Sequence, residues 1–204
     1  MNIRYIKIAV FLACLVPFGV LVWDAFTANL GANPVEALLH RSGDWTLRFL
    51  MIVLAVTPIK RLTGWAWPLR LRRMLGLFAF FYACSHFLVY TLLDLQLDFA
   101  HLGADIAKRP YITIGFTALV LLFPLAVTST NAMMRRLGRR WKKLHRLVYV
   151  IAVLGVIHYY WLVKADVREP LIYAAILAAL LGFRLYHYLR ARVSTACVPV
   201  TSKT

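Results

Sequence analysis

The sequence predicts an all-α integral membrane protein, a bundle of six transmembrane helices. Of its 204 residues, 62% are hydrophobic and only 16% are charged, and the mean hydropathy is +0.71. A water-soluble surface normally needs about a quarter of its residues charged, so these residues cannot form one. The apolar residues fall into runs of roughly 15 to 22, and a bilayer core of about 30 Å takes about 20 helical residues per crossing. The chain therefore has room for six spans and for no separate soluble domain.

We expect the six helices at residues 6–23, 45–59, 74–95, 111–127, 147–163 and 171–189. Residues 1–193 then form one six-span domain, and residues 194–204 form a polar cytoplasmic tail. The first apolar run is longer than the core of a signal peptide and no small-residue cleavage site follows it, so we interpret it as a signal anchor. The segment 30–42 begins at a proline and is amphipathic, which predicts that it lies on the membrane or against a partner. We find no internal repeat in the sequence.

The placement of charge predicts the topology. With six spans, one side holds 18 of the 24 basic residues: Arg4, Lys7, Lys60, Arg61, Arg70, Arg72, Arg73, Arg135, Arg136, Arg139, Arg140, Lys142, Lys143, Arg146, Arg184, Arg190, Arg192 and Lys203. The other side holds all eight acids: Asp24, Glu36, Asp44, Asp94, Asp98, Asp105, Asp166 and Glu169. The positive-inside rule then places both termini in the cytoplasm. Topology and membrane lipid thus explain the net charge of +16, and nucleic acid is not an expected partner.

Several classes of site have no motif in the sequence. It contains no Walker G-x-x-x-x-G-K-[ST], no G-x-G-x-x-G, no C-x-x-C and no H-E-x-x-H. Nucleotide, iron–sulfur and zinc-protease chemistry therefore have no support in this chain, and any nucleotide chemistry belongs to a partner protein.

Two histidines lie deep inside expected spans, and an ionisable residue at that depth is by default a hypothesis of function. His86 is eight residues before Asp94 and His158 is six before Lys164, so they lie about 12 and 9 Å below the outer surface at ~1.5 Å per residue. Two imidazoles at matching depth on spans that run in the same direction are suited to the axial positions of a haem b iron. The alternative is that each is a hydrogen-bonded packing residue. We consider Ser85 and Tyr159 as partners that orient the two rings.

A second cofactor level is suggested nearer the inner face. His145 is thirteen residues before His158, about 20 Å lower, but thirteen residues turn a regular helix to roughly 140° off the starting face. A shared stack of cofactors therefore requires a bulge or a strong tilt. The matching position on the third span is Arg72, and an arginine is a poor haem ligand. Arg72 and Arg73 are instead suited to a haem propionate or a flavin phosphate.

Long ordered blocks of the chain resemble one family. These blocks are LGANPVEALLHRSG, RRMLGLFAFFYACSHFLVY, RPYITIGFTAL, TSTNAMMRRLGRRWKKLHRLVY and VIHYYWLVK, and the match around them extends from about residue 15 to residue 188. They resemble the haem-binding membrane subunits of the bacterial periplasmic protein-methionine-sulfoxide reductase system, the MsrQ/YedZ family of the ferric-reductase-like transmembrane superfamily. The resemblance implies one haem b or two, FMN, and metal ligands at His86, His145 and His158. It also implies a periplasmic molybdopterin-containing catalytic subunit as the electron acceptor.

The function that we expect is electron relay across the inner membrane to that subunit, for the repair of oxidised envelope proteins. Because the chain lacks the flavin–nucleotide domain of wider relatives, the electrons come from quinol or from a cytoplasmic flavin reductase. The chain is then an electron-transfer subunit rather than the catalytic subunit that reduces the sulfoxide. Two alternatives stay open: a stand-alone b-type cytochrome that reduces metal ions or quinones, and a non-redox proton-coupled transporter. Inverted repeats and broken helices, which many transporters have, are not apparent in the sequence.

Overall fold

The computed structural model describes residues 3–98, 103, 106–163 and 166–196, and within these ranges it contains helices and no strand. The helices are α1 (Ile3–Phe26), α2 (Pro34–Thr63), the short η1 (Trp67–Arg70), α3 (Arg72–Val89), the π-helical turn η2 (Tyr90–Asp94), α5 (Pro110–Val127), α6 (Asn131–Leu137), α7 (Arg139–Leu144), α8 (Leu147–Leu162) and α9 (Arg168–Ala196). Within the described residues, five helical stretches are long and apolar enough to cross a membrane: Ile3–Phe26, Arg72–Asp94, Pro110–Val127, Arg139–Leu162 and Arg168–Arg192. The protein is thus an all-α, multi-pass membrane protein.

The helix α2 is the most buried of the long helices and differs most from its prediction. It packs against α1, α3, α8 and α9, and its buried side chains include Leu50 and Leu54. It begins eleven residues earlier than expected, at Pro34, because the Asn33 side chain accepts a hydrogen bond from the Glu36 N–H and proline suits the first helical position. Residues 34–42 of the segment 30–42 thus form the first turns of α2 and are not a separate amphipathic element.

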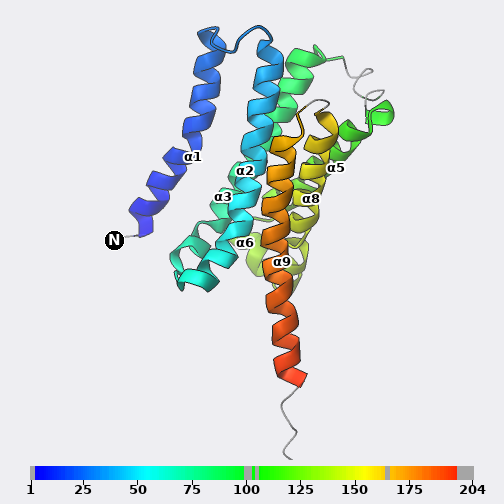
Figure 1. Cartoon of the computed structure of the whole chain (residues 1–204). Helices are drawn as coiled ribbons and strands as arrows, with labels where there is room; N and C mark the ends of the chain where they lie inside the picture. The colour runs from blue at the N-terminus through cyan, green and yellow to red at the C-terminus, as the bar shows by residue number, and fades with distance from the viewer. Residues whose placement is uncertain (1–2, 99–102, 104–105, 164–165, 197–204) are drawn as a thin grey trace, which may run out of the picture.

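Two helical hairpins make up the centre of the bundle. In the first, α2 packs along α3, and in the second, α5 packs along α8, with α3 and α5 in contact between the hairpins. Figure 1 shows α1 beside the first hairpin and the long α9 extending beyond the other helices at one end. The last helix runs to Ala196, past the expected residue 189, and the rest of the expected tail lies outside the described residues.

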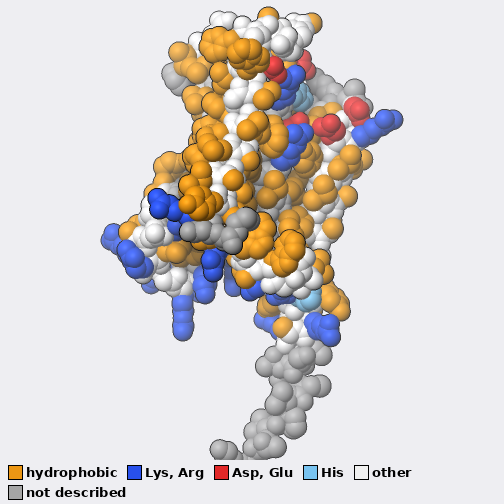
Figure 2. All heavy atoms as spheres, turned by 90° about the vertical axis from the view of Figure 1, so that its left-hand side faces the viewer, with side chains coloured by type: hydrophobic (Ala, Val, Ile, Leu, Met, Phe, Trp, Pro, Cys, Tyr) orange, Lys and Arg blue, Asp and Glu red, His pale blue; other side chains and the backbone are white. Residues whose placement is uncertain are grey.

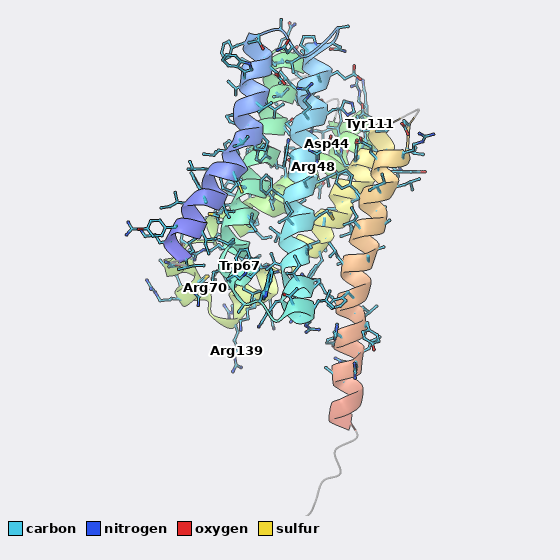
Figure 3. The ribbon with its side chains drawn as sticks, turned by 60° about the vertical axis from the view of Figure 1, so that its left-hand side comes forward. Asp44, Arg48, Trp67, Arg70, Tyr111 and Arg139 are labelled. Atoms are coloured by element: carbon cyan, nitrogen blue, oxygen red, sulfur yellow. The ribbon has the colours of Figure 1, made fainter. Side chains whose placement is uncertain are left out.

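The charged side chains separate toward opposite ends of the bundle. On the face shown in Figure 2, acidic side chains gather at the end where α1 meets α2, and most lysines and arginines gather toward the other end. Figure 3 shows Asp44, Arg48 and Tyr111 in one half of the bundle and Trp67, Arg70 and Arg139 in the other. Asp105, Lys164 and Lys203 lie outside the described residues. This separation agrees with the charge pattern from which the topology was predicted.

Two prolines inside helices are compensated by side chains from other helices. Next to Pro17, the Phe18 N–H donates to the Tyr82 hydroxyl (2.9 Å), which in turn donates to the Cys14 carbonyl (2.8 Å). The hydroxyl thus bridges the Phe18 N–H and the Cys14 carbonyl, which would bond to each other directly in a regular helix, and it connects α1 to α3. In a bilayer no water is available for backbone groups, so such side-chain substitutes are needed.

The second compensation lies at Pro58 of α2. Because proline has no N–H, the Leu54 carbonyl four residues earlier loses its helical donor. Arg184 of α9 supplies one: its Nη2 donates to the Leu54 oxygen (2.6 Å), and its Nη1 donates to the Tyr149 hydroxyl of α8 (2.7 Å). A cation in the membrane is thereby held by a carbonyl and a phenol, and it joins three helices.

Candidate functional site

A cavity of about 230 Å³ lies between α2, α3, α5 and α8, the four helices of the two hairpins. Its walls are mostly leucine, isoleucine, phenylalanine, alanine and glycine, and Asp44, Asp94 and Arg109 also line it. His86 of α3 and His158 of α8 both face this cavity, so the structure brings together the two histidines that the sequence singled out. His145, Arg72 and Arg73 do not line it.

His86 is held by the neighbouring helix α2. Its Nδ1 lies 3.0 Å from the Leu39 carbonyl oxygen and 3.2 Å from the Ser42 hydroxyl oxygen. The serine hydroxyl itself donates to the Leu38 carbonyl (2.7 Å), and a carbonyl can only accept. Nδ1 must therefore carry the proton, which leaves the lone pair on Nε2. That nitrogen is the one available to a metal ion.

His158 is held in the same way by α5. Its Nδ1 lies 2.7 Å from the Tyr111 carbonyl oxygen, so Nδ1 again donates and Nε2 keeps its lone pair. The expected partners Ser85 and Tyr159 were wrong. The Ser85 hydroxyl donates to the Phe81 carbonyl of its own helix (2.9 Å), and the Tyr159 hydroxyl donates to Glu169 (2.9 Å).

The two imidazoles are spaced as a single metal ion between them requires. Their ring centroids are 6.2 Å apart, and the ring planes are inclined by 81°. A ring nitrogen binds a first-row metal at about 2 Å and lies roughly 1 Å in front of its ring centroid, so two imidazoles on opposite sides of one ion have centroids about 6 Å apart. The described residues contain no group of three or more His, Cys, Asp or Glu suited to a metal. A porphyrin would supply the further ligands of an iron held between these two imidazoles.

The orienting groups on α2 and α5 were missed in the sequence. The Leu39 and Tyr111 carbonyls belong to the backbone and leave no residue signal. The backbones of Gly43 and Gly115 lie against the two imidazoles, and these glycines did give a weak signal in the sequence. A glycine inside a helix costs about 1 kcal/mol of stability relative to alanine, so its presence suggests a packing or functional role.

His145 lies in a different environment, at the junction of α7 and α8. Its ring stacks on the Trp141 indole with centroids 3.8 Å apart, and its Nδ1 is 3.1 Å from the Trp141 carbonyl oxygen. Its Nε2 is buried, with no hydrogen-bond partner in the described part of the chain. The helix also departs from regular geometry here, because Arg146, Val148 and Tyr149 bond three residues back rather than four. The rotation between His145 and His158 therefore differs from that of a regular helix over the same thirteen residues.

The two arginines expected at the inner level are placed differently from each other. The Arg72 guanidinium is close enough to His145 to act on it electrostatically. The Arg73 Nη1 instead donates to the Asn131 side-chain oxygen and approaches the Met134 sulfur (3.7 Å), both on α6. Of the pair, Arg72 is therefore the one with an electrostatic effect on His145.

Comparisons with known proteins agree with this arrangement. The family model described as "Ferric reductase like transmembrane component" matches residues 42–156, which run from Ser42 beside His86 into α8. The chain belongs to this family. It is 52% identical to the protein-methionine-sulfoxide reductase heme-binding subunit MsrQ of Herminiimonas arsenicoxydans, over 91% of this chain and 86% of that protein. The MsrQ proteins of Ralstonia nicotianae (55% identical, 91% and 87% covered) and Rhodospirillum rubrum (56%, 92% and 91%) are similar over the same extent. The resemblance to MsrQ predicted from the sequence blocks is thus confirmed.

Proposed function

We propose that the chain is a haem-binding electron-transfer subunit that serves a methionine sulfoxide reductase, with haem b held between His86 and His158. The observation that supports this most directly is the imidazole pair: both Nδ1 atoms donate to backbone carbonyls, and the centroids are 6.2 Å apart in an apolar cavity. The relatives' name, heme-binding subunit, supports the same assignment.

In this function the protein supplies binding, orientation and insulation. When bound, the haem iron supplies one-electron redox chemistry, whereas reduction of a sulfoxide takes two electrons, so the relay operates twice per turnover. The Leu39 and Tyr111 carbonyls fix the ring tautomers, and the leucine and phenylalanine walls exclude water from the metal. No side chain of this chain breaks a bond in the substrate.

We propose the following topology for this role. The sixth span is α2, which packs against four of the five apolar stretches, α1, α3, α8 and α9, and contributes Leu39, Leu47 and Leu50 to the lining of the cavity. Six spans and the segregated charges place both termini in the cytoplasm and the protein in the bacterial inner membrane. The acidic end, which is closer to His86 and His158, then faces the periplasm.

An inner cofactor level at His145 is a further part of the proposal. The orphaned, buried His145 Nε2 is the atom that would bind a metal, and the neighbouring Arg72 is suited to an anionic group of the same cofactor. Arg73 is assigned to the rim of that level. Binding of FMN is suggested by the family resemblance alone. Arg72 and Arg73 are the residues that we propose for its phosphate group.

The partners follow from the two ends of the path. We propose that a molybdopterin-containing reductase subunit docks at the acidic periplasmic end and takes the electrons there. The donor is quinol or a cytoplasmic flavin reductase, and the basic cytoplasmic end suits an acidic protein donor.

Haem content and spectra of single variants test this proposal. Purified wild-type protein should show a Soret band and a reducible low-spin spectrum, and His86→Ala and His158→Ala should each remove that low-spin haem. His145→Ala should leave it in place. Colourless protein from a haem-replete host would contradict the proposal, and so would a wild-type spectrum in either of the first two variants.

Reoxidation of the reduced protein tests the partner. The protein, reduced chemically in nanodiscs, is mixed with oxidised methionine sulfoxide reductase subunit, and haem reoxidation is followed by stopped flow. Rapid reoxidation is expected. No reoxidation under any condition would favour a stand-alone cytochrome instead.

A further inference from the structure

The groups that hold the two histidines recur at one fixed distance along the chain. Leu39 and Tyr111 supply the carbonyls, Gly43 and Gly115 lie against the rings, and His86 and His158 are the histidines. Each member of the second set stands 72 residues after its counterpart. In both sets the glycine is four residues after the carbonyl, one helical turn further along the same face.

The same offset relates most of the cavity wall. Of the 26 residues that line the cavity, 22 fall into eleven pairs 72 residues apart, such as Leu47 with Leu119 and Leu50 with Leu122. The hairpin of α2 and α3 and the hairpin of α5 and α8 therefore contribute corresponding surfaces. The sequence shows no internal repeat, but the two hairpins correspond position by position around the cavity.

The two hairpins run in the same direction through the bundle. In each, the first helix starts at the acidic end and the second returns to it, so the relation is a rotation about an axis along the bundle and not an inversion. Repeats of this kind bring equivalent residues to equal depth on opposite sides of a central ligand. The matched depths of His86 and His158 follow from this relation.

The glycines allow the close approach that each half-site uses. A Cβ built on Gly115 would lie 2.7 Å from His158 Nδ1 and 2.8 Å from its Cε1, closer than side-chain contacts allow. A Cβ on Gly43 would lie 3.3 Å from His86 Cε1 and 3.4 Å from its Nδ1. Any larger residue would push the ring away from the helix backbone, and the Nδ1–H from its carbonyl.

We propose that the cavity is assembled from two copies of one half-site, and that Gly43 and Gly115 are its paired positioning residues. Each lets a histidine ring lie against helix backbone with Nδ1–H on the carbonyl one turn earlier. This rests on the proposed function for the identity of the ligand, but the geometry of the half-sites does not depend on it.

The two copies differ in how much room they have. His158 has one acceptor and the tighter glycine, whereas His86 has two acceptors, Leu39 and Ser42, and a looser contact. Replacing Gly115 with alanine is therefore expected to disturb His158 more than replacing Gly43 disturbs His86.

The test compares three alanine substitutions in the full-length chain. Gly115→Ala and Gly43→Ala alter the half-sites, and Gly76→Ala is the matched control. Gly76 lies in α3, ten residues before His86, but it does not line the cavity, and its Cβ would have no neighbour within 4 Å. The measurements are haem affinity, the spin state by electron paramagnetic resonance, and the ¹⁵N resonances of the ring nitrogens in the haem-free protein.

Gly115→Ala should weaken haem binding by roughly 10–100-fold, as loss of an orienting hydrogen bond does at metal sites, and convert low-spin to high-spin haem. In the haem-free protein it should remove the Nδ1–H signal of His158 and leave that of His86, which reports that the fold is intact. Gly43→Ala should have a smaller effect, and Gly76→Ala should resemble wild type.

Two results would overturn the positioning role. One is a Gly115→Ala protein with wild-type affinity, spin state and His158 resonances, and the other is an equal loss in Gly76→Ala. A wild-type protein without haem would refute the proposed function instead, and the ¹⁵N resonances of the haem-free variants would still decide the positioning role.

Discussion

Replacing Tyr82 with phenylalanine tests how the bundle tolerates a proline in its first helix. The Tyr82 side chain is fully buried, and its hydroxyl accepts from the Phe18 N–H at 2.9 Å and donates to the Cys14 carbonyl at 2.8 Å. Phenylalanine keeps the ring and its packing against Phe49 and Phe81 and removes only these two hydrogen bonds.

The expected cost follows from the two backbone groups left behind. A buried group without a partner costs about 1–3 kcal/mol, while measured hydrogen bonds between membrane helices average about 0.6 kcal/mol each because relaxation recovers part of the loss. With two bonds lost, we expect Tyr82→Phe to lower the free energy of unfolding by roughly 1–3 kcal/mol. Equilibrium unfolding in mixed detergent, followed by circular dichroism, measures this difference.

Two comparisons make the result specific. Tyr188→Phe is the matched control, since that ring is 52% exposed and packs against Arg192, and it should change stability little. In a Pro17→Ala background the Phe18 N–H has a regular helix available, so the cost of Tyr82→Phe should fall. Equal unfolding of wild type and Tyr82→Phe, or the same cost in both backgrounds, would refute the idea that the hydroxyl replaces a step of the α1 ladder.

Two further predictions concern the inner half of the bundle. Arg184→Met should destabilise the protein by about 1–3 kcal/mol, since the Leu54 carbonyl loses its donor. The cost should be smaller in a Pro58→Ala background, where residue 58 regains an N–H for that carbonyl. Unfolding in detergent measures both costs, and equal values would contradict the view that Arg184 replaces the missing donor of Pro58. Reversing Arg139 and Arg140 to Glu, with basic residues added elsewhere to preserve insertion, should slow reduction by an acidic donor and weaken its salt dependence. Unchanged rates across salt concentrations would leave topology as the sole role of these charges.

The parts of the fold that depend on composition could be predicted from the sequence. Apolar runs gave helices close to α1, α5 and α8, and the depth of His86 and His158 led to their pairing across one cavity. The start of α2 was missed because its apolar run begins well after its N-cap, although Asn33 and Pro34 are a recognisable helix start.

The parts that depend on backbone contacts could not be predicted in the same way. The acceptors for both histidines are carbonyls, which every residue has, so the sequence suggested hydroxyl side chains in their place. The repeat escaped notice because most paired cavity residues differ in type, as Asp44 and Phe116 do, and the pairing is one of position and not of identity. A search for equal spacing between glycine and histidine, Gly43 to His86 and Gly115 to His158, would have revealed it.

The use of carbonyls to hold the histidines has a consequence for the haem. A carboxylate at Nδ1 makes an imidazole a stronger electron donor, which stabilises the oxidised iron, whereas a neutral acceptor does so less. His86 has a second neutral acceptor in Ser42, so Ser42→Ala should make that imidazole slightly less basic and raise the midpoint potential, with Leu39 still holding the ring. Ser85→Ala is the matched control. Ser85 is adjacent to His86 in sequence, but its hydroxyl donates to the Phe81 carbonyl of its own helix and not to the His86 ring. Potentiometric titration of both variants distinguishes the two hydroxyls: a shift for Ser85→Ala and none for Ser42→Ala would show that the orienting bonds have been assigned to the wrong helix.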